Sequence, residues 1–146
     1  MHVKAARPGA PTIHPMLVES GTLAEHHRRC DVLFAAARQS AMADVPDTLR
    51  AHVAALREAL LAHFRYEEEH VFPLYEQACG EAGACGWLCA QHDDMRGILW
   101  MLATASAEED RMRYRADLAE LQALFEAHAA DEESRMYPLF ERLLGR

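Results

Sequence analysis

The spacing of apolar residues predicts an all-helical chain. From residue 22 onwards, apolar residues recur at intervals of three and four, the period of an α-helix with one buried face. Good helix formers, above all Leu, Ala, Glu, Arg and Met, dominate the composition. The pattern predicts four helices, at about residues 22–42, 48–78, 86–104 and from 106–110 to 144.

Turn and cap residues separate these helices. They are a capping box at Thr22–Glu25, a turn at Asp44–Asp47, the breaks at Gly80 and Gly83, and the cap signals at 106–110. Pro73 and Pro138 predict local disturbances of the second and fourth helices, because proline removes a backbone hydrogen bond. Residues 1–20 contain several prolines and no periodic apolar pattern. We therefore expect an irregular arm over 1–20 and one bundle over 21–146.

The chain also contains an internal repeat. Residues 67–76 read EEEHVFPLYE, and residues 132–141 read EESRMYPLFE. The same shift along the chain maps His63 onto His128 and Glu67 onto Glu132. Two such helical hairpins predict an antiparallel, up-down four-helix bundle with an internal two-fold repeat.

Six ionisable residues fall on the apolar stripes of the predicted helices. On the first helix the stripe runs through Leu23, Cys30, Leu33 and Ala37 and takes His26 inward, while the neighbouring His27 is about 100° away around the helix. Residues equally far from a turn lie at equal heights in an antiparallel helical hairpin. The pairs of His26 with His63, of Glu67 with His92, and of His92 with His128 are each centred on a predicted turn. One polar layer inside the bundle is therefore predicted, made of His26, His63, Glu67, His92, His128 and Glu132.

Two carboxylates in such a core need cations to neutralise them. Burying an unpaired carboxylate costs several kcal/mol. No lysine lies on these stripes to pair with the two glutamates. A pair of metal ions would remove the cost, with the glutamates bridging and the histidines capping the ends. Mixed imidazole and carboxylate ligands suit iron or manganese, and also zinc. A structural zinc or mixed-metal bundle and a metal-free interaction bundle are the alternatives.

The arrangement of these residues resembles the hemerythrin-like HHE family. Its order of H, HxxxE, H and HxxxE is matched by His26, by His63 with Glu67, by His92, and by His128 with Glu132. The resemblance implies a non-haem site of two iron ions with bridging carboxylates, which binds or reacts with O2, peroxide or nitric oxide, or which serves to handle or sense iron. Enzymatic activity stays an open question.

One position departs from the oxygen carriers of that family. They have a fifth histidine one turn after the third, where this chain has Arg96. The departure implies more open coordination positions and argues against a dedicated reversible oxygen carrier. His70 is on the same face as His63 and is an alternative ligand, and Tyr66 is near the site by spacing.

Charge and composition exclude some partners. The formal net charge is −8, whereas nucleic-acid binding needs a concentrated basic surface. No apolar run is long enough to span a membrane, and no apolar stretch follows the basic residues near the N-terminus, so a cytoplasmic protein with reduced thiols is expected. The spacing of Cys79, Cys85 and Cys89 matches no common zinc pattern, and the oligomeric state stays open.

Overall fold

A computed structural model describes residues 20–43, 45–105, 111–143 and 145, and over these residues the chain is helical without strands. The elements are α1 (Ser20–Ala43), α2 (Pro46–Tyr66), the π-helical segment η2 (Glu67–Val71), α3 (Phe72–Cys79), α4 (Gly86–Thr104), α5 (Arg111–Arg135) and α6 (Tyr137–Leu143). The predicted arm and the predicted caps at 106–110 fall outside the described residues, apart from Ser20, which begins α1.

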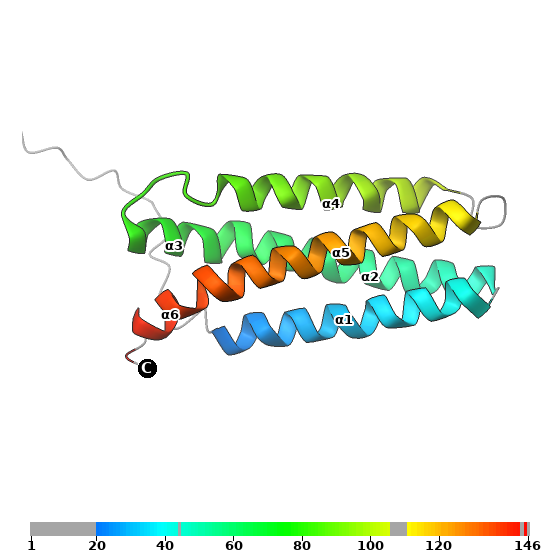
Figure 1. The fold of residues 1–146 in the computed structure, drawn as a ribbon, viewed down its shortest axis with the longest axis horizontal. Coiled ribbons are helices and arrows are strands. Elements are labelled where there is room, and N and C mark those ends of the chain that lie inside the picture. Colours follow the sequence, from blue (N-terminus) through cyan, green and yellow to red (C-terminus); the bar gives the residue numbers. More distant parts are fainter. Residues whose placement is uncertain (1–19, 44, 106–110, 144, 146) are drawn as a thin grey trace, which may run out of the picture.

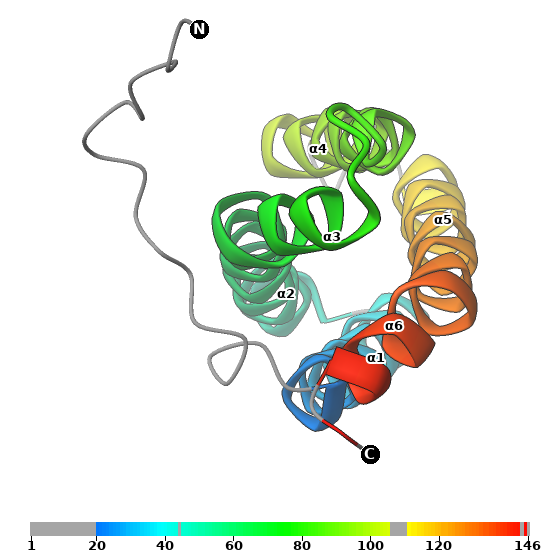
Figure 2. The same ribbon diagram turned by 90° about the vertical axis from the view of Figure 1, so that its left-hand side faces the viewer.

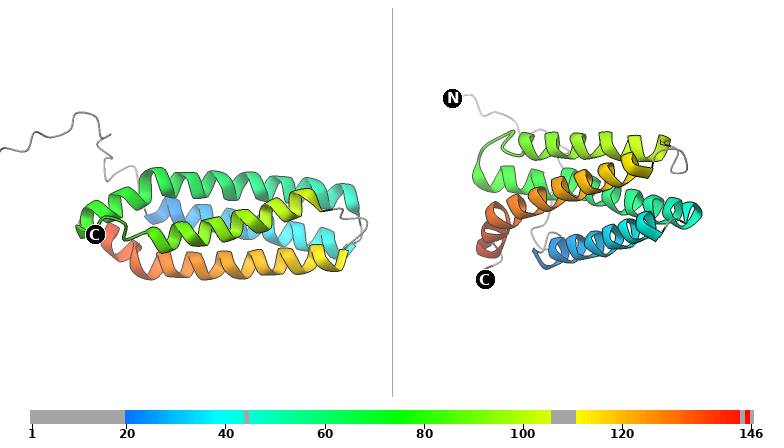
Figure 3. Two further views of the ribbon diagram at one scale, coloured as in Figure 1. Left: turned by 90° about the horizontal axis from the view of Figure 1, so that it is seen from above. Right: turned by 45° about the vertical axis from the view of Figure 1, so that its right-hand side comes forward.

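Four long helices lie side by side along the length of the molecule (Figure 1). Seen end-on, they surround a common centre, with α3 and α6 at the end nearest the viewer (Figure 2). Helix α1 packs against α2 and α5, and α4 packs against α2 and α5, as the additional views also show (Figure 3). No helix of the described residues has the length and apolarity needed to cross a membrane.

The two predicted helix disturbances are present. The stretch predicted as one helix over 48–78 contains the π-helical turn η2, in which the N–H of Phe72 donates to the carbonyl of Glu67, five residues back. Pro73 follows at once, and it cannot donate the hydrogen bond that a regular helix would require of it. Near Pro138, α5 ends and α6 begins on either side of Met136.

Two apolar clusters fill the interior, one on each side of a polar layer. The larger cluster includes Cys30, Phe64, Met95 and Phe125, one from each long helix. The smaller cluster lies toward α3 and α6 and is built from Leu23, Val71, Phe72, Leu74, Cys85, Leu88, Met136 and Phe140. On each long helix, buried His or Glu residues stand between members of the two clusters. The bundle therefore seals a charged layer from water on both sides.

Candidate metal centre

Helix α1 sends His27, and not His26, into the polar layer. The predicted stripe is right at Leu23, Cys30 and Ala37, which are all buried, whereas Leu33 is only partly buried. Between them, however, the structure buries His27, which is 4% exposed, and leaves His26 half-buried. The prediction that His26 faces the core and that His27 points away was therefore wrong. A spacing of three residues and one of four both return to the same helix face, so Leu23 is compatible with either histidine.

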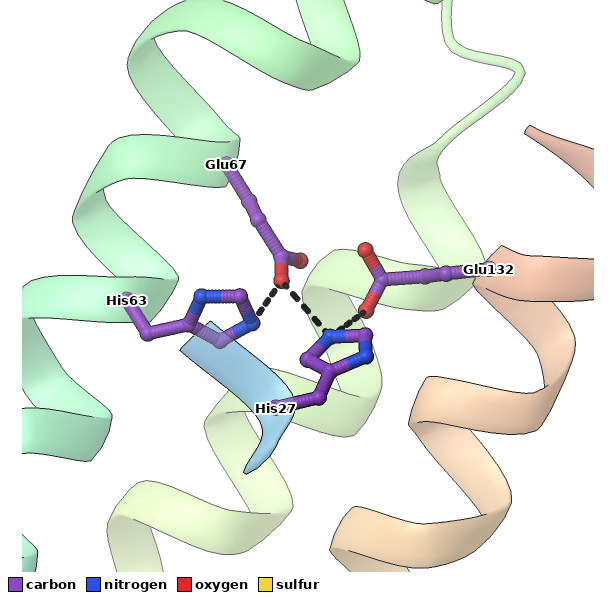
Figure 4. A group of neighbouring side chains, drawn as sticks. All are labelled: His27, His63, Glu67 and Glu132. Carbon is purple, nitrogen blue, oxygen red and sulfur yellow. Dashed lines mark ion pairs between the residues drawn. The ribbon is translucent and has the colours of Figure 1, made fainter. Parts of the chain in front are cut away.

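The first group of possible ligands consists of four buried residues: His27 of α1, His63 of α2, Glu67 of η2 and Glu132 of α5 (Figure 4). One ligand atom of each lies within 4.8 Å of all the others. Nε2 of His27 is 3.9 Å from Oε1 of Glu67 and 3.8 Å from Oε1 of Glu132. Nε2 of His63 is in contact with the same Oε1 of Glu67.

A second group shares Glu67 with the first and adds His92 and His128. The Nε2 atoms of these two histidines are each 3.2 Å from Oε2 of Glu67 and are 3.0 Å from one another. Nε2 of His128 is also 2.6 Å from Oε1 of Glu132. Glu67 thus turns one carboxylate oxygen toward each group, which is the arrangement that a bridging ligand needs.

The outer nitrogen of each histidine has its own partner. Nδ1 of His92 lies 2.8 Å from Oε1 of Glu68, and Nδ1 of His128 lies 2.7 Å from Oε1 of Gln91. Because those oxygens accept hydrogen bonds, each Nδ1 carries a proton, and in the neutral form of the ring each Nε2 turns a lone pair inward. Nδ1 of His27 lies 3.3 Å from the hydroxyl of Tyr137 and 3.5 Å from Oε1 of Glu133.

His63 differs from the other three histidines in its outer partner. Its Nδ1 lies 3.2 Å from Nδ1 of His26, so that one imidazole holds another. The ring of His26 also meets the ring of Tyr66 edge-on, with the centroids 5.2 Å apart. His26 therefore supports a predicted ligand from outside the polar layer.

The ionisable groups perturb one another strongly. Burial by itself raises the pKa of Glu67, but the charge of His63 and the close approach of His128 bring this pKa well below its ordinary value. For Glu132, burial and the neighbouring Glu67 carboxylate raise the pKa well above its ordinary value. Burial alone would lower the pKa of His128, yet the adjacent Glu132 and Glu67 carboxylates raise it to about 9. Without a cation, the layer can hold its two carboxylates only by retaining protons.

The unpaired atoms of this layer fit metal ions. Among the described residues, the buried side-chain atoms without a hydrogen bond are Nε2 of His27 and of His63, Oε1 of Glu67, both carboxylate oxygens of Glu132, and Oδ2 of Asp117. All but the last belong to the polar layer. Lone pairs that crowd around common points without pairing are costly in a sealed interior, and cations remove that cost. Imidazole nitrogen with carboxylate oxygen suits iron, manganese or zinc.

The structure also places the remaining candidates. It brings His63, Glu67, His92, His128 and Glu132 together as the sequence predicts, and their role as metal ligands stays a prediction. His70 is exposed and lies against the ring of Tyr66, outside both groups. Arg96 donates to Oε2 of Glu68 at 2.9 Å and to Oδ1 of Asp93 at 3.0 Å. It thereby holds the carboxylate that orients His92.

Comparison with known protein families gives a match over most of the chain. The family model described as "Hemerythrin HHE cation binding domain" matches residues 19–140 of the chain. Searches of curated proteins and of solved structures each found no significant match.

Proposed function

Because the chain belongs to the hemerythrin HHE cation-binding family, we propose that it is a non-haem di-iron protein that binds or reacts with O2, peroxide or nitric oxide. The observation that carries the proposal is the position of Glu67, whose two oxygens face the two groups of histidines. When bound there, a pair of iron ions supplies one-electron chemistry and coordination positions for a small ligand.

The residues of the chain prepare this site in three ways. The Nε2 atoms of His27, His63, His92 and His128 converge from four helices, so that no side chain has to move far to bind. Their outer partners fix the rings. The apolar clusters above and below exclude bulk water, which strengthens every electrostatic interaction within the layer.

The position of Arg96 bears on the kind of activity. By resemblance, oxygen carriers have a histidine ligand there, whereas Arg96 is engaged with Glu68 and Asp93. A site with fewer protein ligands leaves more positions for an external one. This favours a reactive or sensing role over reversible oxygen storage.

Metal analysis by mass spectrometry, together with the visible spectrum of the aerobic protein, tests the proposal. Protein from cells grown without added zinc should contain about two irons per chain and show near-ultraviolet charge-transfer bands, as expected of a carboxylate-bridged bundle site. The variant Glu67→Gln should lose the bands, whereas His70→Ala, at an exposed position, should keep them. Zinc or no metal, persisting after anaerobic iron loading, would instead indicate a structural metal bundle or a metal-free one.

A further inference from the structure

A cavity of about 320 Å³ lies between α1 and α2 and ends on the polar layer. Its α2 side is lined by Ala55, Ala59 and Ala62, which recur on one helix face. Their methyl groups leave space where larger side chains would fill the groove between the two helices. At its inner end the cavity is lined by His63, which is only 3% exposed.

The lining suits a small ligand without charge. Cys30 and Leu33 of α1 complete the wall with apolar surface, and the charged residues Arg29 and Glu58 also line the cavity. Burial raises the pKa of the Cys30 thiol to about 12, so this side chain stays neutral at physiological pH. Apolar surface in a cavity takes up small apolar molecules such as xenon.

The inner wall of the cavity is the pair of His26 and His63. The two Nδ1 atoms share one hydrogen-bonding contact at 3.2 Å, while the opposite nitrogen of His63 turns toward Glu67 (Figure 4). His92 and His128 are held by the side-chain oxygens of Glu68 and Gln91, whereas His63 is held by another imidazole.

We propose that this cavity is the entrance through which a small uncharged ligand, such as O2 or nitric oxide, reaches the metal centre, passing at the His26–His63 pair. The inference rests on the proposed function for the identity of the ligand. It adds to that function a route and the residues that line it.

Plugging the cavity tests the route. In iron-loaded protein, Ala59→Phe should slow nitric oxide association about tenfold or more in stopped-flow measurements, since on-rates respond to access while the site stays intact. Metal content and the visible spectrum should stay unchanged. Ala55→Phe provides a second plug at an exposed position that tolerates a larger side chain, and Ala51→Phe is the matched control on α2 outside the cavity.

A readout without iron separates this inference from the proposed function. Under xenon pressure, NMR of the methyl groups should show the largest shifts at Ala55, Ala59 and Leu33, and Ala59→Phe should remove them. Failure of the protein to bind iron would overturn the proposed function while the xenon shifts still report on the cavity. Iron binding with unchanged nitric oxide rates in both plugged variants, or xenon shifts elsewhere, would overturn the entrance.

Discussion

Glu67 and Glu132 are both fully buried, yet their pKa values move in opposite directions. Glu67 lies between Nε2 of His63 on one side and the Nε2 atoms of His92 and His128 on the other. Glu132 has His128 close by but also faces the Glu67 carboxylate, which holds its pKa well above the ordinary value. One carboxylate is thus ready to bind cations, and the other becomes a full ligand only when a cation replaces its proton.

The metal-free protein should lose stability as the pH rises from about 6.5 to about 9. His128 has its pKa raised to about 9 in the folded state, so the stability it contributes is complete below its ordinary pKa and is lost as the pH passes through the raised value. The loss should amount to at most about 3.5 kcal/mol, from roughly 1.4 kcal/mol per pKa unit. Urea unfolding of chelator-treated protein at several pH values measures it.

Metal loading provides the control for this pH dependence. Metal binds deprotonated ligands, so loaded protein should be at least as stable at pH 8 as at pH 6.5. A chelator-treated protein whose stability is flat or rising over that range would contradict the pKa of His128.

Removing both buried carboxylates should stabilise the metal-free bundle at alkaline pH, where the imidazole of His128 no longer carries a charge that pairs with them. Above about pH 9, the double variant Glu67→Leu with Glu132→Leu replaces two desolvated groups with apolar side chains of similar size, which should gain about 1–4 kcal/mol. The same variant should bind no iron. Thermal unfolding of chelator-treated proteins and metal analysis of loaded ones measure the two effects, and a loss of metal-free stability would contradict the desolvation argument.

Replacing each of the two neighbouring histidines, His26 and His27, by alanine in turn distinguishes their roles. His27→Ala removes an Nε2 atom from the first group and should strongly lower the metal content of the purified protein, while His26→Ala removes only the outer partner of His63 and should lower that content less. Metal analysis of both variants, matched in expression and purification, decides the matter. The reverse result would restore His26 as the ligand.

Arg96 should act on the metal at a distance, through Glu68 and His92. In Arg96→Ala, Glu68 loses its 2.9 Å donor and holds Nδ1 of His92 less firmly. Loss of an outer partner itself typically weakens metal binding by about 10–100-fold, so loosening Glu68 without removing it should cost at most about tenfold. Competition with a chromophoric chelator measures the affinity, and the exposed Arg28→Ala on α1 is the control. An affinity equal to that of the wild type would show that Glu68 keeps its position unaided.

Local sequence determined the helices and where they are disturbed. The predicted third helix and α4 share the bounds Gly86 and Thr104, because glycines and caps act within a few residues. The disturbances near Pro73 and Pro138 follow from the missing N–H of proline. The sequence also identified five of the six residues of the polar layer, because His-x3-Glu spacing fixes two side chains on one helix face.

Tertiary packing alone decided which histidine of α1 enters the layer. Between Leu23 and Cys30, helical periodicity allows the burial of either His26, three residues after Leu23, or His27, four residues after it. The same choice recurs after Cys30, between Leu33 and Phe34. The structure buries Phe34, whose ring lies 5.6 Å from that of Phe125, and His27 follows in the same phase.

The outer partners of the histidines likewise depended on tertiary structure. Glu68, Gln91 and Tyr137 each support a histidine on another helix, as does His26. Helical periodicity fixes the direction of a side chain around its own axis, but the rotation and height of a neighbouring helix follow from how both cores pack. The sequence by itself therefore determined which residues compose the layer's inner faces, with one exception, and only the packed bundle decided what holds them in place.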